Sequence, residues 1–388
     1  MLETVRCGPA ALLSPARRLG TPGLVGLGLC WLLLVGPASA ASLGVMGDSL
    51  SDEYAEASYG SYAENWVEQL SIYAGIDVGP TAAAAGEPSG SWGPVRRTGY
   101  EYNWALAGAT SNSLLKKGQH TGLAAQVSPV GIAYAVLAIG ANDFHPAKGP
   151  YQSIYAGNWS QSEIDEYVAE SLANINTAID TVLATGVHLV VGNVSDYGIT
   201  ATVRSVTGPI GRQRVADVIS QLNQAIDASA QTRELVVVDL FGAGVAIFGP
   251  HDDPQTELLI GNVTIHLDQG DTGGDNPTAA FVEDGIHPNT TIQGIFANAM
   301  MAAINIAYGA NLTLFTEEQI LAHRGIAYGG SDTLLTELGG DYSDFIHNYV
   351  PRAPLPVPAL SPPGFALLCV LLLATALGAL RQPATGGA

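Results

Sequence analysis

Short apolar runs that alternate with longer amphipathic stretches constrain the fold of this chain more than any other feature of its sequence. The run Ala133–Ile139 is almost unbroken, is too short for a typical helix and is followed by Gly140, so it predicts a strand buried on both faces. Further strands are predicted at Leu43–Met46, Val187–Val191 and Leu235–Leu240, and helices at Tyr62–Ala74, Ile164–Thr185, Arg212–Ser229 and Thr290–Tyr308. Alternation of this kind indicates an α/β fold with a parallel sheet that is covered on both faces.

The second half of the chain mixes irregular and regular patterns. Residues 241–281 are rich in Gly, Asp and Pro and show no helical period, so we expect irregular structure with one hairpin there. Asp268, Asp271 and Asp275 suggest a calcium loop, but their spacing does not fit the usual twelve-residue pattern and favours a solvated acidic loop. Segment 316–319 has the form of a capping box, which predicts a short helix.

Both ends of the chain have the composition of processing or anchoring segments. Residues 1–40 carry three arginines, an apolar run and a final Ala-Ser-Ala, which is typical of a signal peptide cleaved before about Ala41; a buried N-terminal helix is the alternative. Residues 339–364 predict a Pro-rich linker. Residues 365–388 contain an apolar run slightly shorter than a spanning helix of about 20 residues, which predicts a sorting or anchor segment, with a core helix as the alternative. One domain is therefore expected over 41–338.

The charge and cysteine content of the chain restrict its partners. Acidic residues outnumber basic ones by 35 to 15, and because both terminal segments are basic, residues 41–351 carry a net charge of −24. A surface of this charge repels phosphate backbones and anionic membranes, which disfavours nucleic-acid binding and leaves the C-terminal segment as the one membrane contact we expect. All three cysteines lie in the terminal segments, so the predicted domain folds without disulfides.

Two segments far apart in the sequence carry complementary chemistry. Ser49 lies in segment 47–50, directly after the first predicted strand, and Asp284 and His287 lie three residues apart in segment 284–288. A serine hydroxyl becomes a nucleophile only when a base takes its proton, and a histidine serves as that base when another group fixes its tautomer. We therefore predict Ser49 as the nucleophile, His287 as the general base and acid, and Asp284 as the group that orients His287.

A third segment, in the middle of the chain, supplies a donor for an oxyanion. Asn142 follows a predicted strand, and its side-chain amide can hydrogen-bond to the charge that forms when an ester carbonyl is attacked. The backbone N–H of Ser49 is a second predicted donor, and Gly108 is a third because glycine allows a close backbone approach. An ordinary turn glycine is the alternative for Gly108, and local hydrogen bonding is the favoured role of Asp143.

In combination these segments make the chain resemble a GDSL-type hydrolase of the SGNH superfamily, which carries its Ser, Gly, Asn and His in four separate blocks. The corresponding blocks of this chain are residues 47–52, 103–110, 140–143 and 284–288, and residues 193–198 resemble a loop of the lipase-like branch. The resemblance implies a single domain with a three-layer α/β/α fold of flavodoxin-like type and a mostly parallel sheet. It also implies hydrolysis of acyl esters through an acyl-enzyme, with no metal and no organic cofactor.

The Pro-rich tail resembles bacterial C-terminal sorting segments of the PEP-CTERM kind, although residues 357–362 depart from the usual tripeptide and only Arg381 follows the apolar run. This resemblance implies a sorting protease as a partner and a location at the cell envelope or outside the cell. The leading hypothesis is an exported serine hydrolase of a small-molecule, lipid or polysaccharide ester. The alternative is a non-catalytic, envelope-associated binding protein on the same fold, which would have no need for Ser49, Asn142 and His287 together.

Overall fold

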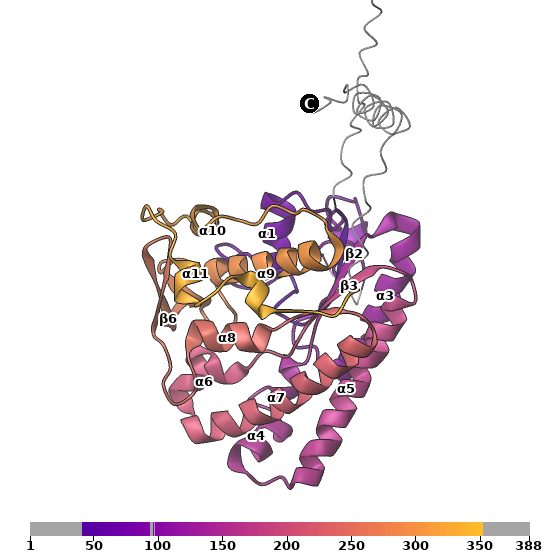
Figure 1. Cartoon of the computed structure of the whole chain (residues 1–388). Coiled ribbons are helices and arrows are strands. Elements are labelled where there is room, and N and C mark those ends of the chain that lie inside the picture. The colour runs from indigo at the N-terminus through magenta and orange to yellow at the C-terminus, as the bar shows by residue number, and fades with distance from the viewer. Residues whose placement is uncertain (1–40, 94–95, 97, 352–388) are drawn as a thin grey trace, which may run out of the picture. The chain divides into compact units, whose positions relative to one another are not determined.

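Four parallel strands and one antiparallel edge strand form the central sheet of the computed structural model, which describes residues 41–93, 96 and 98–351 (Figure 1). The strands lie in the order β1-β2-β3-β4-β8, and β8 runs antiparallel to β4. They comprise β1 (Leu43–Gly47), β2 (Tyr134–Ala138), β3 (His188–Gly192), β4 (Val236–Val238) and β8 (Ile346–Asn348). The predicted mostly parallel sheet is therefore confirmed.

Helices cover both faces of this sheet, because successive side chains of each strand point to opposite faces. Val136 of β2 belongs to a core shared with α1 and α9, whereas its neighbour Leu137 belongs to a core shared with α5 and α7. The first layer contains α1 (Trp66–Tyr73), α9 (Thr290–Tyr308) and α10 (Glu317–His323), and the second contains α2 (Ser111–Lys117), α3 (Gln119–Gln126), α4 (Gly149–Ala156), α5 (Gln161–Leu183) and α7 (Pro209–Thr232). This arrangement is the expected three-layer α/β/α fold (Figure 1).

Capping side chains decide where several helices begin. α1 begins at Trp66 rather than at Tyr62, because the Asn65 side chain accepts a hydrogen bond from Glu68 N and the Glu68 carboxylate accepts one from Asn65 N. The capping box predicted at the start of α10 is present, and α9 has the predicted bounds. The predicted start of α1 was therefore too early, while the other two helices follow their end signals.

Residues 241–281 contain a helix and three strands joined by loops, so the expectation of a mostly irregular stretch is corrected while the expected hairpin is present. α8 (Leu240–Phe248) follows β4 directly, and Asp239 caps it by accepting a hydrogen bond from Gly242 N at 2.9 Å. β5 (Glu257–Ile260) and β6 (Val263–Asp271) form the predicted hairpin, and β7 (Ala279–Val282) pairs with β6 in parallel. This second sheet ends directly before the segment that carries Asp284 and His287.

The domain extends beyond the boundary predicted at residue 338. A linker was expected from residue 339, whereas β8 pairs with β4 through Val236 and Asn348, and Asp239 N donates a hydrogen bond to Phe345 O at 2.8 Å. The short helices α6 (Ala201–Val206) and α11 (Leu334–Glu337) complete the α-helices of the described chain. The predicted signal peptide and the predicted segment 365–388 lie outside the described residues. Within residues 41–351, none of the described helices is long and apolar enough to cross a membrane.

Candidate active site

The carboxyl ends of β1, β2 and β3 bring the predicted segments to one edge of the sheet. Because these strands run parallel, the residues that follow each of them lie at the same edge. Gln119 of α3 fixes the end of β1, since its side chain both donates to Gly47 O and accepts from Gly47 N at 3.0 Å. A Cβ on Gly47 would lie 2.6 Å from the Ala138 carbonyl oxygen, so only glycine fits at this point.

Ser49 lies in a tight turn that Asp48 organises. Asp48 Oδ1 accepts a hydrogen bond from Leu50 N at 3.1 Å, and Asp48 O accepts from Ser51 N at 3.0 Å and Asp52 N at 2.9 Å. Burial raises the pKa of Asp48 to about 6, although the Leu50 N–H acts in the opposite direction. Ser49 is itself 8% exposed, so its hydroxyl is largely shielded from bulk water.

Asp284 and His287 form one hydrogen-bonded unit on a tight turn after β7. His287 Nδ1 lies 2.5 Å from Asp284 Oδ2, and Asp284 Oδ1 accepts from Ile286 N at 2.8 Å and His287 N at 2.9 Å. Gly285 has φ 65°, and a Cβ there would lie 2.4 Å from Thr202 Oγ1, so the turn requires glycine. Because Nδ1 is engaged by the carboxylate, Nε2 is the ring nitrogen that remains for proton transfer.

Opposing effects set the ionisation of Asp284. Burial alone would raise the pKa of this carboxyl, but the hydrogen bond and electrostatic attraction of His287, with the N–H groups of His287 and Ile286, lower the pKa below its usual value. Asp284 is therefore ionised at neutral pH. An ionised carboxylate in this position fixes the imidazole tautomer and stabilises the imidazolium that forms when His287 takes a proton.

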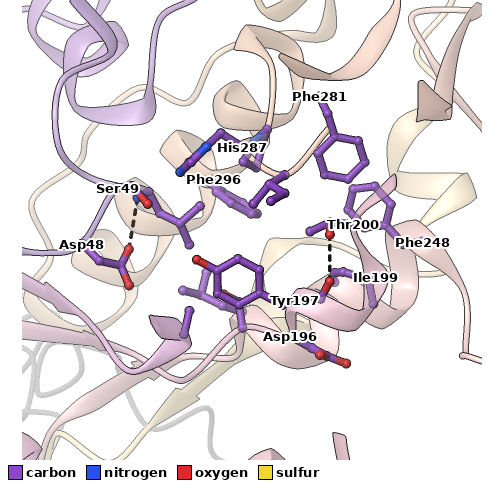
Figure 2. A pocket seen from close by; sticks show the side chains of 17 residues that line it. Asp48, Ser49, Asp196, Tyr197, Ile199, Thr200, Phe248, Phe281, His287 and Phe296 are labelled. Atoms are coloured by element: carbon purple, nitrogen blue, oxygen red, sulfur yellow. Dashed lines mark hydrogen bonds between the residues drawn. The ribbon is translucent and has the colours of Figure 1, made fainter. Parts of the chain in front are cut away.

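Ser49 and His287 line the same cavity, which extends from them between apolar side chains (Figure 2). Phe248 and Phe281 lie at the end remote from Ser49, where their rings stack with centroids 5.3 Å apart. The structure therefore brings the predicted nucleophile and base to one cavity, although 238 positions separate them in the sequence.

Asn142 carries a buried amide group at the same edge of the sheet. Its side chain is almost fully buried, and its Oδ1 accepts a hydrogen bond from Tyr197 OH at 3.0 Å. Its Nδ2 makes no hydrogen bond of normal geometry among the described residues, although the Asn142 amide lies near enough to the Asp48 carboxyl to lower the pKa of that group. Because buried polar groups are normally paired, an unpaired amide here suits a ligand oxygen, and the Tyr197 bond fixes which way the amide points. Tyr197 and Ala141 both line the cavity with Ser49.

Gly108 lies next to a second cavity that Ser49 also lines. Gly108 is exposed and has φ 74°, and its neighbour Ala107 lines this second cavity together with Tyr59. Ala107 N donates to Asp52 Oδ2 at 2.6 Å, which fixes the segment beside the Ser49 turn. The role of Gly108 as a third oxyanion donor stays a prediction.

The carboxylate of Asp143 connects the middle block to the start of α2. Its carboxylate accepts hydrogen bonds from Ser111 N at 2.8 Å and from Ser111 Oγ at 2.7 Å, and Tyr167 OH donates to its carbonyl oxygen at 2.6 Å. The favoured structural role of Asp143 therefore holds, but its carboxylate bonds to α2 rather than locally, while its backbone N–H makes the local bond to Gly140 O at 3.0 Å.

Comparison with known proteins assigns the family. A model of the GDSL-like lipase/acylhydrolase family matches residues 43–300. The chain belongs to this family. Among solved structures it is similar to a GDSL-like lipase of Bacteroides thetaiotaomicron (16% identity, 69% of this chain and 87% of that chain, TM-score 0.36) and to an acetylxylan esterase of Geobacillus stearothermophilus (16% identity, 69% and 94%, TM-score 0.36). No curated protein matches the sequence significantly.

The GDSL-like domain contains a second His–Asp pair, which the sequence analysis did not single out. His251 Nε2 lies 2.7 Å from Asp196 Oδ2, and both side chains are buried. Arg212 Nε donates to His251 Nδ1 at 3.4 Å, and Arg212 Nη2 donates to His251 O at 3.1 Å. Because guanidinium N–H groups only donate, His251 Nδ1 is the acceptor and its Nε2–H donates to Asp196. Both ring nitrogens are thus occupied.

The predicted acidic loop is part of a strand in the GDSL-like domain. Asp268 and Asp271 lie on β6, and Asp271 is fully buried and forms an ion pair with Arg324. Within the described ranges, no group of three or more His, Cys, Asp or Glu side chains is placed to hold a metal ion. The expectation of a solvated loop over residues 268–275 is therefore wrong for Asp271, which is buried on a strand.

The walls of the cavity are the part of the site that sequence analysis missed. Leu240, Gly244 and Phe248 of α8 line the cavity, as does Tyr197. The three α8 residues recur every four positions, which is a helical signal, but they lie in or beside the stretch that was assigned as irregular. Tyr197 lies in the block 193–198 that resembled a family loop, and no role was predicted for its hydroxyl.

Proposed function

We propose that this acylhydrolase cleaves carboxylic esters through an acyl-enzyme on Ser49. The observation that carries the proposal is that Ser49 and His287 line one cavity while His287 Nδ1 lies 2.5 Å from the ionised Asp284. A non-catalytic binding protein would have no need for this combination, nor for an unpaired buried amide on Asn142.

The reaction follows from the roles of these groups. Ser49 Oγ attacks the carbonyl carbon while His287 Nε2 takes its proton, and the carbonyl oxygen becomes an anion that receives hydrogen bonds from Asn142 Nδ2 and the N–H groups of Ser49 and Gly108. The alcohol then leaves with the proton from His287, and the acyl group stays on Ser49. Water repeats the sequence: it gives a proton to His287, attacks the acyl carbon and releases the carboxylic acid as Ser49 regains its hydrogen.

The test uses the full chain, short-chain nitrophenyl esters and a fluorophosphonate label. Ser49→Ala should lower kcat by about 10³ to 10⁶ and remove the label, because the nucleophile is lost. Ser51→Ala is the matched control, since Ser51 lies in the same turn and its hydroxyl accepts a hydrogen bond from Trp66 Nε1 at 3.2 Å; this variant should keep both readouts. A label on another residue, or equal turnover by wild type and Ser49→Ala, would refute the proposal. No turnover and no label would favour the binding protein.

We also propose that the protein is exported and that its mature chain begins at about Ala41. The support lies in the sequence: three arginines, an apolar run and Ala38-Ser39-Ala40 precede the first strand, and the three cysteines lie outside the described domain. Mass spectrometry of the protein from separated cell fractions tests this. An envelope or extracellular protein that still begins at Met1 would contradict the cleavage.

A further inference from the structure

The cavity that begins at Ser49 and His287 is walled mainly by apolar side chains from several elements. One face of α8 supplies Leu240, Gly244 and Phe248, which are spaced four residues apart. Ile199, Phe281 and Phe296 contribute from other elements. Figure 2 shows that the cavity runs from Ser49 and His287 at one end to the stacked rings of Phe248 and Phe281 at the other.

Apart from Ser195, the polar side chains that reach this cavity away from Ser49 are already engaged. Asp196 is paired with His251, and Thr200 Oγ1 donates to Tyr197 O at 2.8 Å. They offer little to a polar ligand group, because a new hydrogen bond would have to replace an existing one. The cavity beyond the reacting groups therefore suits an apolar ligand.

The size of the cavity limits the length of such a ligand. Its volume is about 50 Å³. This volume is taken over the positions open to the centre of a water-sized group, and about 10–15 Å³ is the minimum that holds one such group, so the cavity admits a short chain of a few groups. An acetyl group would leave most of this space empty, and a long acyl chain would meet Phe248 and Phe281.

Gly244 lies where a side chain would narrow the cavity. It is buried inside α8, and a Cβ on it would lie 2.9 Å from Ile199 Cδ1 on the facing wall. Glycine inside a helix is unfavourable by about 1 kcal/mol relative to alanine, so its presence in α8 calls for a packing reason. The packing reason for Gly242, the other glycine of α8, is different, because a Cβ there would meet the capping carboxylate of Asp239.

We propose that this cavity binds the acyl chain of the substrate, that it selects unbranched apolar chains of roughly four to six carbons, and that Gly244 and Ile199 set the length. This inference rests on the proposed function, since the acyl carbon must lie at Ser49. Each methylene that enters an apolar cavity raises kcat/KM about fourfold if its burial is fully realised in the transition state. The gain from acetyl to butanoyl is therefore about 15-fold.

A chain-length series tests the inference. The full chain is assayed on nitrophenyl esters from acetate to dodecanoate, and kcat/KM should rise from acetate to a maximum between butanoate and hexanoate and then fall. Gly244→Val should lose at least tenfold on hexanoate while it stays within about threefold of wild type on acetate, because the added side chain fills the cavity but not the reacting end. Ile199→Ala should move the maximum to a longer ester, since it enlarges the same space. Val245→Ala is the matched control, because Val245 is exposed on the same helix and does not line the cavity.

The outcomes separate this inference from the proposed function. A wild type that prefers acetate, or a Gly244→Val profile equal to that of Val245→Ala in a folded protein, overturns the inference and leaves the esterase intact. If Gly244→Val does not fold, the direction of the shift in Ile199→Ala decides, and an unchanged or shortened maximum overturns the inference. No turnover of any ester and no label on Ser49 overturn both.

Discussion

The two His–Asp pairs of the domain have the same chemical groups in opposite surroundings. The His287 and Asp284 side chains are 19% and 34% exposed, whereas those of His251 and Asp196 are 8% and 3% exposed. His287 uses one ring nitrogen for its carboxylate, while His251 has both nitrogens occupied, one by Asp196 and one by Arg212. Of these two pairs, the exposed one alone therefore keeps a second ring nitrogen for a nucleophile, as the role proposed for His287 requires.

The buried pair has a structural role. It joins Arg212 of α7 and the loop after α8 to Asp196, and the next residue, Tyr197, donates its hydroxyl hydrogen to Asn142 Oδ1. The pair thus supports the segment that orients the proposed oxyanion donor. Variants of both pairs test whether the exposed pair controls turnover and the buried pair controls stability.

The largest expected effect concerns the exposed pair. His287→Ala should lower kcat by about 10³ to 10⁶, as Ser49→Ala does, because each removes the same nucleophile–base unit. The double variant should then lose no more than either single variant. Steady-state kinetics on nitrophenyl butanoate measure this. Losses that multiply in the double variant would mean that the two residues act independently and that the pairing is wrong.

A smaller effect should separate the carboxylate of the exposed pair from the buried histidine. Asp284→Asn should lower kcat by about 10² to 10⁴, because an amide cannot stabilise the imidazolium of His287. His251→Gln should instead leave kcat within about threefold but lower Tm by about 2–6 °C, because it disturbs the hydrogen bonds that the buried Asp196 carboxylate and Arg212 Nε make to the ring, at a cost of about 1–3 kcal/mol. Kinetics and calorimetry on both variants check this. Similar losses of kcat in Asp284→Asn and His251→Gln would contradict the functional difference between the two pairs.

The smallest expected effect tests what the buried pair supports. Tyr197→Phe removes the hydroxyl that orients Asn142, so kcat should fall about tenfold while KM changes little. Asn142→Ala should cost about 10² to 10³ in kcat. In the Asn142→Ala background, Tyr197→Phe should then have almost no further effect, because the group it orients is gone. A full tenfold loss in that background would show that Tyr197 acts on the substrate and not through Asn142.

The regular elements differ in how well the sequence predicts them, for physical reasons. α9 has its predicted bounds because Asn289 caps its start and Gly309, at φ 66°, ends it. α8 was missed because its nine residues are apolar on every side and include two glycines, so no polar face marks a helical period. β8 was missed because a three-residue strand is stabilised by its partner β4 and not by its own sequence.

In the candidate site, too, residues identified by their own chemistry could be predicted, whereas residues that act through long-range contacts could not. Ser49, Asn142, Asp284 and His287 could be proposed as site residues because their side chains have complementary chemical roles, and the structure brings all four to one edge of the sheet or to the cavity beside it. The contact of Tyr197 with Asn142 spans 55 positions in the sequence, so no local pattern announces it. Side chains that orient others can be found only once the chain is folded.

The direction of β8 determines at which edge of the sheet the described domain ends. Because β8 runs antiparallel to β4, the chain enters it at the carboxyl edge of the sheet and leaves at the amino edge, where Tyr349 N donates to Leu235 O at 3.1 Å. β1 also starts at the amino edge. Both ends of the described domain therefore emerge on the side of the sheet opposite Ser49. A tether joined at residue 351 would therefore be attached at the edge of the sheet opposite the cavity. The cavity at Ser49 would then face away from the tether and remain open to ester substrates.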